Sequence, residues 1–232
     1  MTPPTVFDAA PRSVRVYQIE VTNHCNATCT YCPQPTHARP RGFIELATMH
    51  AILRAMSNTE VELHHFGEPL LHKRLEDIVS LCVAHGVAPG ISTNGRTLTQ
   101  DRVDSLARAG LAWLRIHTDP FGVRLSQFKT PVGLEATEHR LLVKSDAPRK
   151  ELQDFAGHLD LVAPNLVRKG RDRCSYLRDD WRVVLWDGRW ARCCNDVEGV
   201  NDDSLCGGCD GYVFATPRTV GDYDGLTIGS ST

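Results

Sequence analysis

Strand-like and helix-like runs alternate along the chain between residues 14 and 165. Apolar residues recur at helical spacing over 44–56 and 75–83, which predicts two amphipathic helices. The runs between them are rich in β-branched and apolar residues and predict strands at 14–21, 61–65, 111–118, 139–144 and 159–163, with one more ending at Ser92. This alternation is typical of an α/β fold with a parallel sheet.

Capping residues predict the bounds of a third helix. Thr99 is a suitable N-cap, and Leu98 and Val103 stand where a hydrophobic staple requires them. Gly110 then supplies an end to the helix. A fourth helix is expected to begin near Asp146.

Length limits how complete a barrel the chain can form. A full eight-unit β/α barrel uses about 250 residues, whereas the alternation here occupies only residues 14–165. That stretch is enough for about five or six units, so a partial, open (β/α) barrel is favoured. A doubly wound sheet has the same alternation and remains an alternative.

Composition excludes several classes of protein. With 41% hydrophobic residues and a formal net charge of −2, the 232 residues can bury a core and carry no dominant basic patch for nucleic acid. No apolar run has membrane-spanning length, and residues 1–8 lack the features of a signal peptide. We therefore expect a cytoplasmic protein with no nucleic-acid or membrane partner, whose nine cysteines serve mainly as metal ligands.

Three of the cysteines form a Cys-x3-Cys-x2-Cys loop directly after the strand-like run 14–21. They are Cys25, Cys29 and Cys32. Three thiolates are one fewer than a closed four-iron four-sulfur cluster needs, so one iron would keep an open position for a ligand. A zinc loop and scattered core thiols are the alternatives.

The aromatic Tyr31 precedes the last of these cysteines, and here the sequence resembles the radical S-adenosylmethionine (radical SAM) superfamily. The resemblance implies that the open iron binds S-adenosylmethionine and that an electron from the cluster cleaves it to a 5′-deoxyadenosyl radical. Two further segments match in order, each after a strand-like run. The implied cofactor-binding residues are Tyr31, the turn Gly67, Glu68 and Pro69, and the segment Ser92, Thr93 and Asn94.

A second group of cysteines lies after residue 173. Four thiolates there would close one four-iron cluster or one structural zinc site, and these are Cys174, Cys193, Cys206 and Cys209. Cys194 is adjacent, and counting does not decide which of the pair ligates. Cys82 falls on the apolar face of a predicted helix and is expected to be a buried small hydrophobe.

The spacing of this second group resembles the twitch form of the SPASM extension, which implies an auxiliary four-iron cluster. A hairpin over 181–190 with its turn at Asp187-Gly188 agrees with it. The twelve residues between Cys193 and Cys206 are fewer than usual. The expected organisation is a flexible segment 1–13, a partial barrel 14–167, a twitch-like domain 168–215 and a tail 216–232.

Within the superfamily, the pattern most resembles a twitch-type dehydrogenase that oxidises an amino-cyclitol in aminoglycoside assembly. This implies hydrogen abstraction from a small polar substrate, an auxiliary cluster that accepts an electron, and a reducing partner such as flavodoxin or ferredoxin. Candidate catalytic residues are His117, Asp119, Arg168 and Cys194. A radical epimerase, a sulfur-inserting enzyme, a peptide-modifying enzyme and a non-catalytic iron-sulfur or zinc protein are the alternatives.

Overall fold

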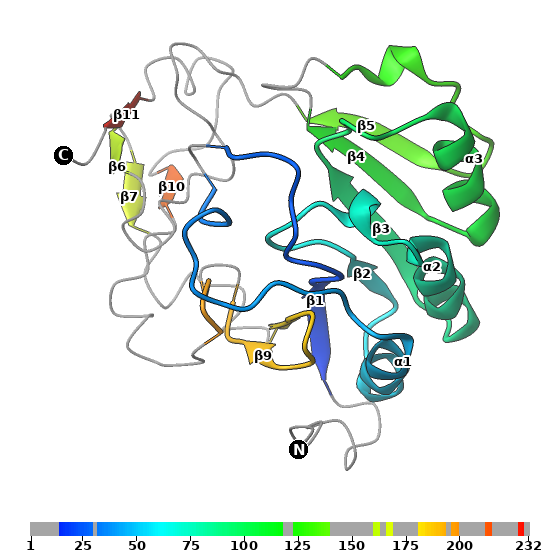
Figure 1. Ribbon diagram of the computed structural model, residues 1–232, viewed down its shortest axis with the longest axis horizontal. Coiled ribbons are helices and arrows are strands. Elements are labelled where there is room, and N and C mark those ends of the chain that lie inside the picture. The colour runs from blue at the N-terminus through cyan, green and yellow to red at the C-terminus, as the bar shows by residue number, and fades with distance from the viewer. Residues whose placement is uncertain are drawn as a thin grey trace.

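A seven-stranded, mostly parallel sheet dominates the structure, a computed structural model that describes residues 14–29, 32–117, 123–139, 160–162, 166–168, 181–193, 196–199, 212–214 and 227–229. Figure 1 shows the sheet with its helices gathered on one side. In spatial order the strands are β5 (Glu135–His139), β4 (Trp113–His117), β3 (Ala88–Thr93), β2 (Glu60–Glu62), β1 (Arg15–Ile19), β8 (Trp181–Val184) and β9 (Trp190–Ala191).

The order of the strands decides between the two expected architectures. Strands β1 to β5 lie side by side in chain order, and every neighbouring pair among them is parallel. A doubly wound sheet reverses its strand order at a switch point, and β1 to β5 contain no reversal. The sheet is therefore a partial β/α barrel, as the length of the chain predicts.

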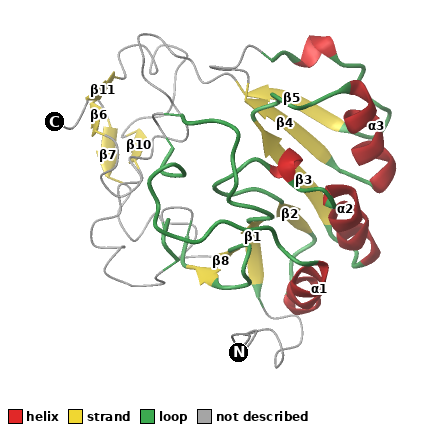
Figure 2. Ribbon diagram, viewed as in Figure 1, coloured by secondary structure: helices red, strands yellow, loops and turns green. Residues whose placement is uncertain are grey.

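Three α-helices connect the strands of the sheet and cover one of its faces (Figure 2). Because right-handed crossovers between parallel strands put consecutive helices on the same side of a barrel, this arrangement follows from the topology. The helices are α1 (Leu46–Ala55), α2 (Leu75–Ala84) and α3 (Gln100–Ala109), and two short 3₁₀ helices are η1 (Pro69–Leu71) and η2 (Leu125–Gln127).

The capping residues set the bounds of α3 as the sequence predicts. The Thr99 hydroxyl accepts a hydrogen bond from the backbone N–H of Arg102, and the helix ends at Gly110. Leu98 and Val103 are both buried beside this cap. Local chemistry alone therefore accounts for where this helix begins and ends.

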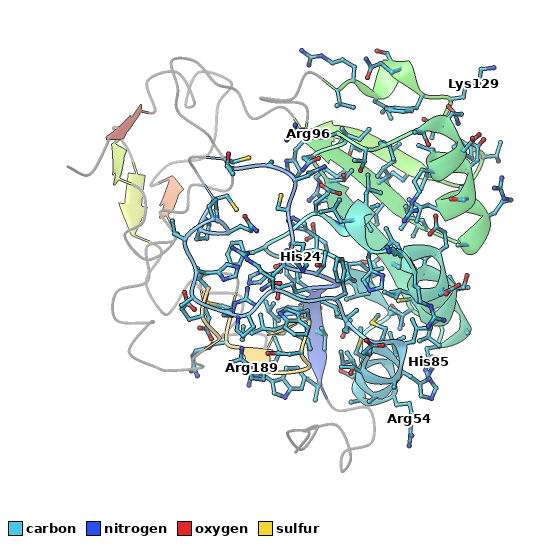
Figure 3. All side chains as sticks on the ribbon, in the orientation of Figure 1. His24, Arg54, His85, Arg96, Lys129 and Arg189 are labelled. Carbon is cyan, nitrogen blue, oxygen red and sulfur yellow. The ribbon has the colours of Figure 1, made fainter. Side chains whose placement is uncertain are left out.

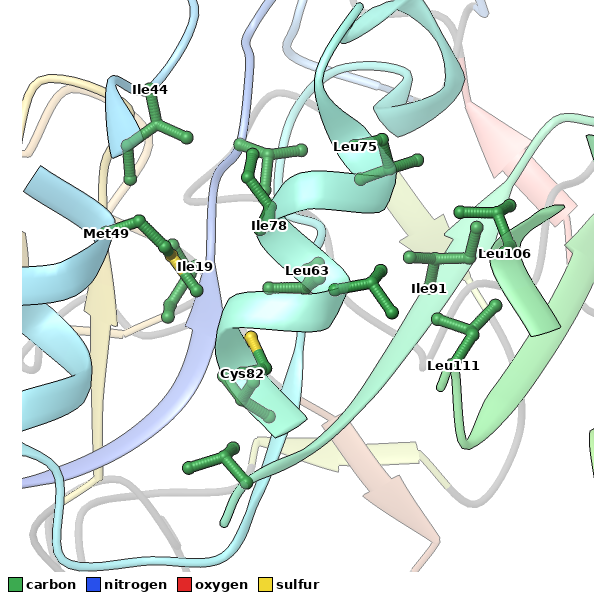
Figure 4. Close-up of a cluster of buried hydrophobic side chains, with 14 of the residues drawn as sticks. Ile19, Ile44, Met49, Leu63, Leu75, Ile78, Cys82, Ile91, Leu106 and Leu111 are labelled. Atoms are coloured by element: carbon green, nitrogen blue, oxygen red, sulfur yellow. The ribbon is translucent and has the colours of Figure 1, made fainter. Parts of the chain in front are cut away.

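The hydrophobic core lies between the helices and the sheet. Ile78 of α2 and Met49 of α1 are fully buried against apolar strand residues such as Ile19 and Ile91 (Figure 4). Arg54, by contrast, points away from the sheet on the outer side of α1 (Figure 3). Cys82 is also fully buried in this core, and burial raises the pKa of its thiol to about 12. It is the buried small hydrophobe that the sequence predicts.

The last two strands that the sequence predicts are described to different extents. Strand β5 (Glu135–His139) is a polar strand at the edge of the sheet that the sequence did not predict, and of the strand expected over 139–144 only residue 139 lies within the described residues. The strand expected at 159–163 is β6 (Asp160–Val162), which pairs with β11 (Thr227–Gly229) outside the main sheet. A second such pair joins β7 (Leu166–Arg168) to β10 (Tyr212–Phe214). The helix expected near Asp146 lies outside the described residues.

The predicted hairpin over 181–190 is present and extends the main sheet. Strand β8 pairs with β1 in parallel, β9 returns antiparallel, and Gly188 lies in the turn between them. The segment that carries Cys193 is therefore joined by backbone hydrogen bonds to the first strand of the barrel. Among the described residues, no helix is long and apolar enough to cross a membrane.

The core supports a prediction about stability. Ile78→Ala should lower the free energy of unfolding by about 2 to 5 kcal/mol, because it leaves a cavity between α2 and the sheet. Val83→Ala in the same helix is the matched control, since Val83 is exposed and its truncation should change stability by less than about 0.5 kcal/mol. Urea titration of anaerobically purified protein measures both. Equal losses in the two variants would contradict the packing described above.

Candidate active site

The cysteine loop follows β1 at the carboxyl end of the sheet. Cys25, Cys29 and Cys32 are half-buried and free of disulfides, and the Cys32 N–H donates to the Cys29 carbonyl at 3.1 Å. Burial raises the pKa of the Cys25 thiol, and the charges of Glu68 and Cys29 raise it further. Thiol and carboxylate groups therefore gather at one place, which is a donor set suited to a cationic metal cluster.

Among the described residues, no three His, Cys, Asp or Glu side chains converge on a single metal ion. Thiolates that hold a four-iron cluster bind separate irons and are spaced by the cluster itself. The absence of such a group therefore argues against a site for a single metal ion in the described residues, whereas the four-iron cluster at these cysteines stays a prediction. Tyr31, next to Cys32, lies outside the described residues.

The turn after β2 packs directly on the beginning of the cysteine loop. The N–H of Glu68 donates to the carbonyl of His24 at 2.8 Å. Gly67 has φ 148°, and a Cβ at this position would lie 2.1 Å from the carbonyl oxygen of Thr22. Only glycine fits there, so the turn and the loop hold each other in place.

The carboxylate of Glu68 joins this turn to the end of β3. Glu68 is 1% exposed and accepts hydrogen bonds from Thr93 Oγ1 at 2.6 Å, from the Asn94 N–H at 2.8 Å and from the Leu70 N–H at 3.0 Å. Burial raises its pKa, and these hydrogen bonds partly oppose the rise. A carboxylate offers about four acceptor positions, so one remains for a ligand.

The end of β3 returns to the cysteine loop through Asn94. Its amide donates to Asn26 Oδ1 at 2.8 Å and approaches Cys25 Sγ at 3.9 Å, a distance at which an N–H can stabilise a thiolate. The Arg96 guanidinium donates to the Asn26 carbonyl. His24 and Arg96, both labelled in Figure 3, belong to two of these converging segments. The structure therefore brings together the three sequence motifs that lie far apart in the chain.

Ser92 takes a different direction from its neighbours in the motif. Its hydroxyl donates to Glu62 Oε1 at 2.5 Å rather than to the cysteine loop. Pro69 is buried at the start of η1, where it shapes the turn after Glu68.

A buried ion pair that the sequence did not reveal anchors the part of the loop that follows the three cysteines. Arg39 binds Glu20 through two hydrogen bonds of 2.6 and 2.8 Å, and both side chains are at most 2% exposed. Arg39 Nε also donates to the Val197 carbonyl at 2.6 Å. Burial raises the pKa of Glu20, while Arg39 lowers it. The sequence signal that could have indicated this contact is an acidic residue, Glu20, within an otherwise strand-like run that leads into the cysteine loop.

His37 is a second residue of the loop that the sequence did not single out. It is buried, its Nε2 lies 2.7 Å from the Arg41 guanidinium, and burial together with Arg39 and Arg41 lowers its pKa to about 4. Because an arginine only donates, Nε2 is the acceptor and the ring is neutral. Arg41 also donates to the Gln34 carbonyl at 2.6 Å, which closes the loop on itself.

The remaining predicted site residues divide by how far the structure describes them. His117 ends β4, Cys193 is half-buried just after β9, and Arg168 ends β7. The residues outside the described part of the chain are Tyr31, Asp119, Cys174, Cys194, Cys206 and Cys209. The auxiliary ligand set and the catalytic roles therefore stay predictions.

Comparison with known proteins agrees with this geometry, because residues 19–122 match the radical SAM superfamily. The chain carries a radical SAM domain. The domain contains all three converging motifs, and its family implies a four-iron four-sulfur cluster and S-adenosylmethionine. The thiol, carboxylate and amide groups that meet where the three motifs converge fit both the four-iron cluster and S-adenosylmethionine chemically.

Two curated relatives of the radical SAM domain are similar over part of their length. The S-adenosyl-L-methionine-dependent 2-deoxy-scyllo-inosamine dehydrogenase of Niallia circulans is 32% identical over 101 residues, 40% of this chain and 40% of the relative. The GTP 3',8-cyclase of Chlorobaculum tepidum is 32% identical over 120 residues, 48% of this chain and 35% of the relative. The matches span less than half of the length of either relative.

A solved structure confirms the fold. The structure of BtrN in complex with AdoMet and 2-DOIA superposes with a TM-score of 0.58 at 19% identity, over 94% of this chain and 100% of that one. At 19% sequence identity, the similarity between the two structures shows a shared fold. It confirms the partial barrel that chain length and strand order indicate.

The Glu20–Arg39 pair generates a prediction. Arg39→Met should lower the free energy of unfolding by about 3 to 5 kcal/mol, because it leaves the Glu20 carboxylate buried and uncompensated. Removing both charges, with Glu20→Gln and Arg39→Met together, should cost less than the sum of the single changes. Arg74→Met is the control, since the Arg74–Asp77 pair is more than half exposed and should contribute less than about 1 kcal/mol. A loss in Arg39→Met no larger than in Arg74→Met would contradict the role of the buried pair.

His37 generates a prediction about pH. Its pKa is near 4 in the folded protein and near 6.5 when unfolded, so below pH 6.5 the unfolded chain binds a proton that the folded protein does not. Stability should therefore fall as the pH decreases from about 6.5 to 4. Urea titrations across this range should show a shallower fall for His37→Asn, with His50→Asn on the outer side of α1 as the control. An unchanged slope in His37→Asn would contradict the assignment of a neutral, buried ring.

Proposed function

We propose that this protein is a radical S-adenosylmethionine oxidoreductase. The observation that carries the proposal is the meeting of Cys25, Glu68 and Asn94, from three separate segments, at the carboxyl end of the sheet. Cys25, Cys29 and Cys32 would hold the four-iron cluster, and the cluster with bound S-adenosylmethionine would supply a 5′-deoxyadenosyl radical. In this proposal the chain provides a binding site and a fixed orientation for the substrate.

Each converging residue has a distinct task in this proposal. The remaining acceptor position of Glu68 suits the ammonium group of S-adenosylmethionine, because its other three are occupied by N–H and O–H donors. Asn94 orients the loop through Asn26 and places an N–H beside the Cys25 sulfur. Gly67 allows the turn to approach the loop closely enough for both contacts.

The proposed substrate is a small polar natural-product intermediate such as a sugar, a cyclitol or a nucleoside, and the proposed outcome is its oxidation. The similarity to the dehydrogenase of Niallia circulans supports this choice. Cys193 with Cys174, Cys206 and Cys209 would hold a second cluster, whose chemistry is to accept one electron. His117, at the end of β4, is a candidate base for the hydroxyl proton, with Asp119, Arg168 and Cys194 as further candidates. Flavodoxin or ferredoxin would supply the first electron.

The proposal predicts the behaviour of cysteine variants. Anaerobically reconstituted protein should bind iron for two clusters and, with a reductant and S-adenosylmethionine, form 5′-deoxyadenosine. Replacing Cys25, Cys29 and Cys32 by alanine should remove about four irons per chain and all of the 5′-deoxyadenosine. Cys82→Ala is the matched control, because that thiol is buried in the core with a pKa of about 12 and should leave both quantities unchanged.

Two results would reject the proposal. One is formation of 5′-deoxyadenosine by the triple cysteine variant, and the other is its absence from fully loaded wild-type protein. The fate of the substrate is a separate measurement, made in deuterated solvent. Formation of a ketone supports oxidation, whereas solvent deuterium on a substrate carbon indicates epimerisation and substrate-bound sulfur indicates insertion.

A further inference from the structure

A row of polar side chains lies on the face of the sheet opposite the helices. Side chains alternate between the two faces of a strand, and in β4 the buried Leu114 and Ile116 belong to the core under the helices, which puts Arg115 on the other face. Gln18 of β1 is in register with Glu62 of β2. Strands β1, β2 and β4 thus contribute to one polar surface on the inner face of the partial barrel.

Glu62 is the centre of this row. It is 7% exposed and accepts hydrogen bonds from Gln18 Nε2 at 2.8 Å and from Ser92 Oγ at 2.5 Å. The Arg115 guanidinium lies 4.0 Å from its carboxylate and His64 Nδ1 lies 3.8 Å away, both beyond hydrogen-bond distance. Two neutral donors thus occupy two of the about four acceptor positions of the carboxylate. Arg115 adds a long ion pair, and His64 Nδ1 lies within ion-pair distance.

Gln18 supplies a second observation. It is 9% exposed, and its Oε1 atom is buried without a hydrogen-bond partner. The orientation of the amide follows from Glu62, because exchanging its oxygen and nitrogen would set two acceptors against each other. A buried acceptor without a donor is costly. A molecule that carries an N–H or O–H group would satisfy it.

The same face offers an aromatic surface beside the polar row. Gly90 is in register with both Glu62 and Trp113, and a Cβ on Gly90 would lie 1.8 Å from the Trp113 ring. The ring therefore lies over the Gly90 backbone, with the Arg115 guanidinium 5.1 Å from its centre. An aromatic face of this kind suits the C–H face of a small ring compound.

We propose that Gln18 and Glu62 form the substrate subsite and that they select an amine-bearing polyol, such as an amino-cyclitol or an amino sugar. The Gln18 oxygen accepts from a hydroxyl or amine of the substrate, and the carboxylate of Glu62 compensates the charge of its ammonium group. This inference rests on the proposed function, since it names the substrate class for the radical SAM domain. No motif of the domain includes either residue.

The experiment measures binding to reconstituted protein that contains S-adenosylmethionine. Two probes are titrated calorimetrically: 2-deoxy-scyllo-inosamine, which carries an amine, and myo-inositol, which does not. Wild-type protein should bind the amine probe at least about tenfold more tightly. Glu62→Gln should abolish that preference, whereas Gln18→Met should weaken both probes by about tenfold.

Two control variants remove a carboxylate or an amide at positions outside the proposed subsite. Glu60→Gln removes an exposed carboxylate from the same strand, and Gln127→Met removes an exposed amide, and both should keep wild-type affinities. If Glu62→Gln does not fold, Ser92→Ala provides a test of opposite sign. Removing that donor frees an acceptor position on the carboxylate and should increase the preference for the amine probe.

The inference is overturned by an unchanged amine preference in Glu62→Gln, by unchanged affinities in Gln18→Met, by a reduced preference in Ser92→Ala, or by no binding of either probe to wild-type protein. Formation of 5′-deoxyadenosine without substrate is measured on the same samples. If 5′-deoxyadenosine forms and one of these results is also obtained, only the subsite is rejected. If 5′-deoxyadenosine is absent from loaded wild-type protein, the proposed function is rejected.

Discussion

The ion pair between Glu20 and Arg39 connects parts of the chain that are far apart in the sequence. Glu20 directly follows β1, and Arg39 belongs to the loop after the three cysteines. Arg39 also donates to the carbonyl of Val197, which lies shortly after Cys193 in the chain. Trp186 of the β8–β9 turn also donates to Glu20, at 3.4 Å. Two charges buried together must stay together, because separating them would leave each one desolvated without compensation. The loop is therefore tied to the sheet by electrostatics as well as by its covalent connection to β1.

The two faces of the sheet differ in chemical character. The face toward α1, α2 and α3 is apolar and supplies the free energy that holds the barrel together. The opposite face carries Gln18, Glu62 and Arg115, whose polar groups contact one another through a hydrogen bond and a long ion pair. One alternating strand pattern thus gives both a core and a chemical surface.

Local signals account for what the sequence predicts well. The Thr99 cap fixes α3, the apolar periods fix α1 and α2, and the Asp187-Gly188 turn marks the hairpin. The meeting of the three motifs also follows from sequence, because strand ends in a parallel barrel share one edge.

The contacts that sequence did not predict link residues far apart in the chain. Arg15 pairs with Trp181 where β8 joins β1, and no local pattern marks either residue as a partner. Glu20 and Arg39 are 19 positions apart, on a strand and an irregular loop. Strand β5 was not predicted, because its residues are mostly polar and carry no apolar strand pattern. Tertiary pairing decided these cases.

The parallel pairing of β8 with β1 has a consequence for electron movement. The β8–β9 hairpin leads directly to Cys193, and β8 is hydrogen-bonded to the strand that ends at the cysteine loop. If Cys193 holds a second cluster, backbone hydrogen bonds of the sheet set the gap between the two redox centres. Electron transfer slows steeply as such a gap widens, so in that case the β8–β9 hairpin would fix the distance over which an electron moves.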